Sequence, residues 1–240
     1  MSTAATQVAE PTGAPKEGKP RHYGFSALFS GAARMWRAWL PCVVVIVVNA
    51  VIQGLLVIRD PAVTASASFI AAVVISLVCI LATYAVITAS ALGAVEGKVG
   101  FGEAFKSSGR HLGLFVAWVL GLMVVSLAAY MVYVYPGFIV LAITPYVAVA
   151  AMAGRGNALA ANFRAIAGRP GRTLLTVILI GIMLFIVSLL AAANYFFTWF
   201  FVRGFASSLV AWIAYGLLAW WWTTALACVY RSTAVGDETA

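Results

Sequence analysis

Residues 39–58 read WLPCVVVIVVNAVIQGLLVI, a run without a single charged side chain. A helix rises about 1.5 Å per residue, so roughly 20 apolar residues cross the hydrocarbon core of a bilayer, which is roughly 30 Å thick. The rest of the chain has the same character, because 64% of its 240 residues are hydrophobic, only 9% are charged and the mean hydropathy is +1.02. A soluble domain carries about a quarter charged residues. The composition therefore excludes a soluble enzyme and predicts a polytopic membrane protein.

Five further apolar windows bring the predicted number of transmembrane helices to six. The windows are continuously apolar, whereas the strands of a membrane barrel alternate apolar with polar residues, so we expect an all-α bundle. A charged turn at residues 59–61, the Pro-Gly turn at 135–137 and the aromatic segment 194–205 group the spans into three hairpins. The predicted spans are residues 39–58, 69–95, 112–134, 138–153, 173–193 and 206–230.

The positions of the cations predict the orientation of these spans. Thirteen of the 15 Lys and Arg residues lie before span one, between spans two and three, between spans four and five, or after span six. Cytoplasmic loops retain Lys and Arg, so we expect both termini in the cytoplasm and the protein in the cell membrane. The net charge of +8 then reflects topology and attraction to anionic headgroups rather than nucleic-acid binding. Residues 1–22 read as a disordered tail, 23–231 as the membrane domain and 232–240 as a short tail.

A short amphipathic stretch precedes each hairpin, at residues 25–39, 101–112 and 157–166. Apolar residues recur in them at three- and four-residue spacing, which is typical of a helix lying on the inner leaflet. Alternatively, any loop rich in Ala, Phe and Arg between spans has this appearance. The predicted contacts to anionic lipid are Arg34, Arg37, Lys106, Arg110, Arg164 and Arg169.

Small and amide residues mark faces on which spans can pack. Gly113, Ala117 and Gly121 recur every four residues, and so do Ala85, Ala89 and Gly93, which allows helix backbones to approach closely. Each stripe is either a seam within the chain or a homodimer face. Asn49 and Gln53 lie one turn apart in span one, and form either an interhelical link or a polar site within the bundle.

Span four is the irregular span. Pro136 and Gly137 open it, and Pro145 lies inside it, where the missing amide hydrogen predicts a kink. Broken helices line binding sites in transporters, so the kink is a candidate site. Thr144 can instead bond the carbonyl that Pro145 frees, which makes the kink a purely structural feature.

The sequence assembles no recognisable catalytic chemistry. None of the seven acidic residues lies at the centre of a span, and His111 has no convincing metal-ligand spacing with the nearby glutamates. The three cysteines, Cys42, Cys79 and Cys228, lie in different apolar runs without a CxxC pair. We therefore expect no enzyme activity, no cofactor and no metal.

Two family resemblances accompany these patterns. The segment YPGF at residues 135–138, the AGRG at 153–156 and the stretch from Ala158 to Arg169 resemble the membrane domain of the glycerophosphodiester phosphodiesterase family and YciC-type membrane proteins. This resemblance covers about residues 25–230 and implies a six-span bundle, fused in some members to a soluble phosphodiesterase. It matches only the membrane part, so no catalytic or metal residue is carried over. Glu103, Ala104, Phe105 and Gly109 are similar to the coupling segment of ABC importer permeases, although the later Leu-Pro element is missing.

These observations favour a non-enzymatic scaffold or accessory protein that binds lipid, anionic lipid above all, a partner membrane protein or a second copy of the chain. The alternative is a transporter or permease subunit with its site at span four. An intramembrane lipid-processing enzyme ranks third, because it needs a Glu/His cluster that the sequence does not suggest.

Overall fold

The computed structural model describes residues 25–59, 66–97, 99–132, 134–168 and 204–237, together with scattered residues between 170 and 193. Every element assigned in these ranges is a helix, which confirms the predicted all-α class. The predicted tail at residues 1–22 lies outside the described residues, and so do 8 of the 21 residues of span five.

The described helices follow one another along the chain in the order of their labels. They are α1 (Phe25–Met35), the 3-10 turn η1 (Trp36–Ala38), α2 (Trp39–Arg59), α3 (Ala67–Glu96), α4 (Phe101–Val132), α5 (Val134–Ile143), α6 (Val147–Met152), α7 (Ala158–Gly168) and α9 (Phe205–Asp237). Four stretches within the described ranges are long and apolar enough to cross a membrane: Phe29–Val57, Ala67–Glu96, Phe101–Val132 and Phe205–Arg231. They contain predicted spans two and six and all but the last one or two residues of predicted spans one and three.

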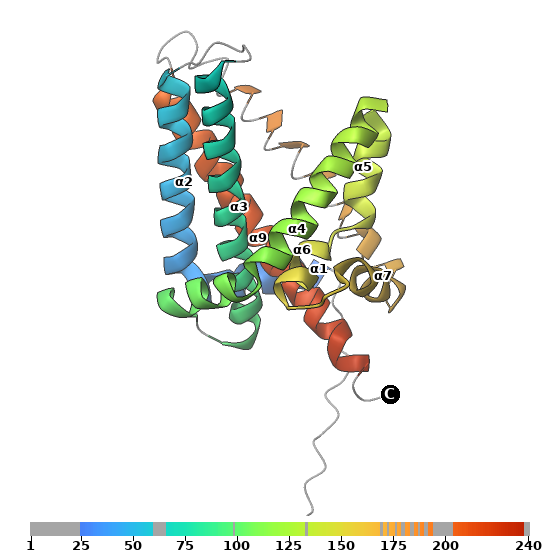
Figure 1. Ribbon diagram of the computed structural model, residues 1–240. Helices are drawn as coiled ribbons and strands as arrows, with labels where there is room; N and C mark the ends of the chain where they lie inside the picture. The colour runs from blue at the N-terminus through green and yellow to red at the C-terminus, as the bar shows by residue number, and fades with distance from the viewer. Residues whose placement is uncertain are drawn as a thin grey trace, which may run out of the picture.

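The helices form two diverging arms that meet at one end (Figure 1). Helices α2, α3 and α9 pack against one another in the first arm, whereas α4 and α5 form the second. Helix α6 lies near the junction and contacts α3, α4, α7 and α9. Helices α1 and α7 and the first turns of α4 gather at this same end of the bundle, and the described end of α9 lies there too (Figure 1). The three predicted surface segments therefore share one end of the molecule.

Glycines set the close approach of α9 to the helices at the start of the described chain. A methyl group at Gly31 of α1 would lie 2.9 Å from the Ala225 Cα atom, so the two backbones are nearly in contact. A methyl group at Gly216 would lie 2.6 Å from the Ile46 side chain of α2. Bundle helices in lipid are held by such close packing, because apolar burial gains little there.

Side chains placed in the sequence just before a helix supply its missing hydrogen bonds. Ser66 accepts a bond from the Phe69 amide at 3.3 Å and caps α3, while Asn157 accepts from the Ala160 amide at 2.9 Å and caps α7. The Glu103 carboxylate accepts from the Gly100 amide at 3.1 Å, which is the acidic half of a capping box at the start of α4. This structural role accounts for the Glu103 carboxylate.

The structure differs from the predicted elements in three places. Helix α4 is continuous from Phe101 to Val132, so the predicted surface helix 101–112 and span three are one helix, since no breaker residue separates them. Span four is broken outright into α5 and α6 rather than kinked, and neither piece is long enough to cross a membrane alone. Helix α9 continues to Asp237 and takes in most of the predicted tail at 232–240.

Candidate functional site

The break between α5 and α6 lies at Thr144 and Pro145. Proline has no amide hydrogen and cannot continue the bonding pattern of α5. The Thr144 hydroxyl donates to the Val140 carbonyl at 2.7 Å, and the Thr144 amide donates to the Leu141 carbonyl at 3.4 Å. Thr144 thus bonds the carbonyls near the end of α5, as the sequence analysis anticipated.

Asn162 of α7 holds the two sides of the break together. Its side chain is fully buried, donates to the Ile143 carbonyl at 2.8 Å and accepts from the Tyr146 amide at 2.9 Å. The Tyr146 hydroxyl in turn lies 3.2 Å from the Thr173 hydroxyl. Unpaired backbone groups are costly at membrane depth, so irregular backbone survives there only when protein groups satisfy it. Asn162 meets this requirement.

The connection from α6 to α7 is also built for close packing. Gly154 has a φ of +77°, and the Gly154 and Arg155 amides donate to the Ala151 and Ala150 carbonyls, both at 3.0 Å. This is a Schellman motif, which favours glycine at the left-handed position. A methyl group on Gly154 would lie 2.8 Å from the His111 Nε2 atom. His111 is therefore a packing neighbour of the α6–α7 connection.

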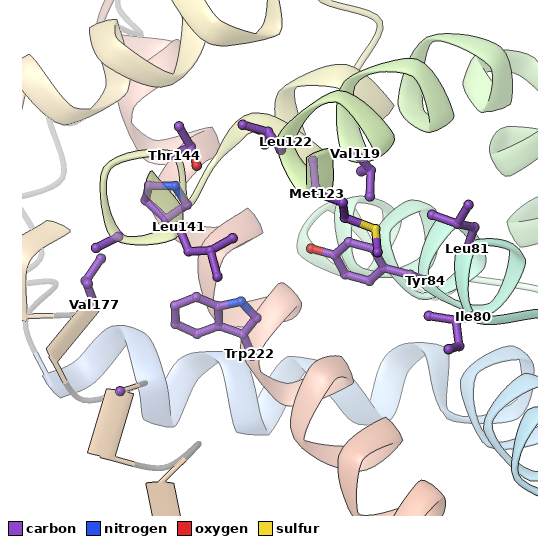
Figure 2. Close-up of a pocket in the computed structure, with 14 residues that line it drawn as sticks. Ile80, Leu81, Tyr84, Val119, Leu122, Met123, Leu141, Thr144, Val177 and Trp222 are labelled. Carbon is purple, nitrogen blue, oxygen red and sulfur yellow. The ribbon is translucent and has the colours of Figure 1, made fainter. Parts of the chain in front are cut away.

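A cavity of about 500 Å³ adjoins the break, and we call it the break cavity. Figure 2 shows Tyr84, Leu141 and Trp222 facing this space from α3, α5 and α9. Leu141 and Met123 on its wall are 54% and 46% exposed, so the cavity communicates with the outside of the bundle. Its lining residues are Ile80, Leu81, Tyr84, Val119, Leu122, Met123, Leu141, Ala142, Thr144, Pro145, Ala148, Val177, Gly181 and Trp222.

The chemistry of this lining is apolar. None of the described lining residues carries a charge, and both hydroxyl groups are already engaged. Thr144 donates to Val140, and the Tyr84 hydroxyl hydrogen-bonds Thr223. A polar or ionic ligand would lose its hydration here and find only the Trp222 indole N–H and two hydroxyl oxygens as partners. The cavity therefore suits hydrocarbon.

The predicted amide pair links two helices. The Gln53 amide nitrogen donates to the Asn49 Oδ1 atom and to the Ser76 carbonyl, both at 3.3 Å, and the Ser76 hydroxyl donates to the Gln53 Oε1 atom at 2.8 Å. Asn49 and Gln53 are both buried. The bonds to Ser76 make this pair an interhelical link between α2 and α3. Gln53 also lies at the edge of a groove described below.

The two small-residue stripes have different surroundings. Ala85 and Ala89 are buried, and a methyl group on Gly93 would lie 2.7 Å from the Val99 side chain, so this stripe is a packing seam. Gly113, Ala117 and Gly121 are exposed, and a methyl group on either glycine would contact nothing within 4 Å. The second stripe is therefore not a seam between the described helices. Of the Pro136 and Gly137 pair, Pro136 lies in the first turn of α5, where proline is tolerated.

Two of the predicted lipid-contacting arginines bond to protein atoms. Arg34 donates to the Cys228 thiol at 3.5 Å, and Arg37 donates to the Ala94 carbonyl at 3.4 Å. Lys106, Arg110 and Arg164 are exposed near the end where the surface segments gather, whereas Arg169 lies outside the described residues. The sequence predicted the same role for all six cations, because a charge pattern does not reveal which side chains bond to protein atoms.

Three residues of this region escaped the sequence analysis. Tyr84 is one aromatic residue within an apolar span, and Asn162 is one polar residue in an amphipathic stretch. Trp222 belongs to the triplet Trp220–Trp222, which in the sequence fits packing bulk or a contact with a bound lipid or a partner helix. In the sequence, little distinguishes an asparagine that packs against a proline break from any other polar residue of an amphipathic helix. Within the described ranges, no group of three or more His, Cys, Asp or Glu residues is placed to hold a metal ion.

Comparisons of the chain with protein-family models, with curated proteins and with solved structures found no match. The family resemblances noted above therefore stay predictions.

Proposed function

We propose that this chain is a non-enzymatic, six-span protein of the cell membrane that binds lipid, with both termini in the cytoplasm. It acts as a scaffold or accessory subunit, taking a hydrocarbon tail into the break cavity. Exposed cations at the end where the surface segments gather, Lys106, Arg110 and Arg164, attract anionic headgroups of the inner leaflet.

This proposal rests on the apolar break cavity, which adjoins the break that Asn162 holds together. About 500 Å³ lies within the range of ligand sites, which run from roughly 300 to 1,000 Å³. The wall residues Leu141 and Met123 are exposed, so in a membrane a tail enters directly from the surrounding lipid. Charged solutes have no described partner in the lining, which favours lipid over a polar substrate.

Filling the cavity tests the proposal. Ala142 lines the break cavity, whereas Ala128 of α4 is exposed and does not line it. The variant Ala142→Phe is expected to retain several-fold less lipid than the wild type when both are purified in mild detergent and analysed by native mass spectrometry. The matched variant Ala128→Phe is expected to retain the wild-type amount. Equal lipid retention in all three proteins would remove the proposal.

A transporter or permease subunit is the second candidate, and the break at Pro145 is the observation that favours it. Transporters place sites at discontinuous helices. In this case Pro145→Ala changes the flux of a lipid or an apolar solute across proteoliposomes by more than about threefold. If proteoliposomes with the wild type and with Pro145→Ala show the same flux of fluorescent lipid, the scaffold function is the better explanation.

A further inference from the structure

A second hollow lies farther along α3, toward the end at which α3 begins. It has a volume of about 510 Å³ and lies between α2, α3 and Trp212 of α9. Gln53 and Ser76 contribute its polar edge, and we call it the Gln53 groove. Its lining residues are Gln53, Leu56, Val57, Phe69, Ala72, Val73, Ser76, Leu77, Ile80 and Trp212.

The Gln53 groove and the break cavity share Ile80 as a wall residue. They also share a face of α3, because Phe69, Ala72, Ser76, Ile80 and Tyr84 follow one another at three- and four-residue spacing. Helix α9 borders both hollows, with Trp212 at the groove and Trp222 at the cavity. The two hollows thus follow one another along α3 on either side of Ile80, and we call the pair the α3 furrow.

The length of the α3 furrow exceeds the depth of one leaflet. Phe69 and Tyr84 lie about 22 Å apart along the helix axis at 1.5 Å per residue. One leaflet contributes about 15 Å of hydrocarbon, half of the roughly 30 Å core. An occupant of the whole furrow therefore extends beyond the bilayer midplane.

The width of the furrow identifies the shape of its occupant. The Gln53 groove runs about 16 Å along α3 from Phe69 to Ile80, and all of its empty space, the part open to the outside included, amounts to about 1040 Å³. A helix with its side chains is about 10–12 Å across, so over the same length it fills roughly 1,300–1,800 Å³. A second copy of the chain or a partner helix does not fit inside, whereas a single hydrocarbon chain does.

We propose that the α3 furrow binds one long hydrocarbon chain of a lipid, which passes Ile80 and occupies the Gln53 groove and the break cavity together. This inference rests on the proposed function, because the break cavity is its inner half. It adds the class of ligand: a lipid whose single chain is longer than one leaflet is deep. The bonded Gln53 and Ser76 side chains keep the α2–α3 wall of the groove in place while offering the chain no free donor.

Two photoactivatable fatty acids test this inference on the full chain in nanodiscs. One is hexadecanoic acid and the other decanoic acid, each with a diazirine at the terminal carbon. In the wild type, both probes are expected to label residues of the furrow. The variant Ile80→Trp is expected to lower labelling by the hexadecanoic probe about tenfold. Ile80 also lines the break cavity, so the decanoic probe is compared in Ala72→Phe, in which its labelling is expected to stay within twofold of the wild type.

Matched variants separate a blocked path from a disturbed fold. Ile75 lies on α3, is 47% exposed and lines neither hollow, so Ile75→Trp is expected to label like the wild type. If Ile80→Trp does not fold, Ala72→Phe narrows the Gln53 groove instead, and its neighbour Ala71→Phe, which lines neither hollow, is the control. Of these two variants, only Ala72→Phe is expected to lose labelling by the hexadecanoic probe.

The outcomes distinguish the two proposals. If blocking variants leave long-chain labelling unchanged, or if both probes label only residues around Tyr84 and Trp222, the α3 furrow is wrong and tail binding in the break cavity stands. If neither probe labels the cavity in the wild type, the proposed function fails as well.

Discussion

The Asn162 side chain donates to the Ile143 carbonyl at 2.8 Å, and so joins α7 to the last residue of α5. Its other atom accepts from Tyr146 on the far side of the break at 2.9 Å. Helix α7 buries Ala158, Ala161 and Ala165 along with Asn162. One short helix therefore fixes the geometry of the residues that line the cavity at Thr144 and Pro145.

Replacing Asn162 with leucine is expected to destabilise the protein by about 2–5 kcal/mol, because two buried backbone groups lose their partners at about 1–3 kcal/mol each. The free energy of unfolding in a mixed-micelle titration measures the change. Asn157→Ala removes only the cap of α7 and is expected to cost about 1 kcal/mol. If Asn162→Leu lowers the free energy of unfolding no more than Asn157→Ala does, Asn162 does not hold the two sides of the break together.

Removing the amide of Gln53 is expected to weaken the α2–α3 contact modestly. Gln53→Leu loses three bonds to Asn49 and Ser76, and interhelical bonds in membranes contribute about 0.6 kcal/mol on average and at most about 1.7 kcal/mol. Ser76→Ala removes the 2.8 Å bond alone and is expected to show the smaller share. A double-mutant cycle of the two substitutions measures their coupling, and strictly additive effects would show that the pair does not act together.

Adding a methyl group to two glycines is expected to have opposite effects. Gly216→Ala forces the Ile46 side chain to move and costs about 1–3 kcal/mol; because the crowding atoms are Ile46 Cγ2 and Cγ1, the same substitution is expected to cost less in an Ile46→Ala background, which lacks both atoms. Gly121→Ala meets open space and is expected to be neutral or to stabilise by up to about 1 kcal/mol, because alanine favours helix. Unfolding titrations of the variants check both signs. A destabilised Gly121→Ala that also dissociates on size-exclusion chromatography would instead reveal a homodimer face.

Neutralising the ion pair between Glu96 and Arg231 is expected to change stability by less than about 0.5 kcal/mol. The two side chains are 62% and 42% exposed, and exposed pairs contribute little because water screens them. Glu96→Gln is compared with the wild type by unfolding at low and high salt. A loss above about 1 kcal/mol would mean that this end of α3 and α9 is less accessible to water than its exposure implies.

The sequence predicted those structural elements that depend on local residue patterns. Long apolar runs predicted the four long helices, and Asn157 marked the start of α7 because caps are local signals. The break at Pro145 was visible, yet its degree was not, since Asn162 stabilises it from another element. The cavity escaped prediction because it depends on how Tyr84 and Trp222 meet across helices far apart in the chain.

The exposed face of Gly113, Ala117 and Gly121 shows the same limit. Small residues at four-residue spacing permit close packing, but spacing cannot say whether a neighbour is present. The difference between this stripe and that of Ala85 and Ala89 lies entirely in tertiary arrangement.

Helix α9 packs on α1 and α2, with every other described element between them in the chain. Because α9 is made after α1 and α2, the first arm cannot close until residues 205–237 have been synthesised. A chain that ends ahead of residue 205 is expected to leave uncovered the face of α1 and α2 on which α9 packs.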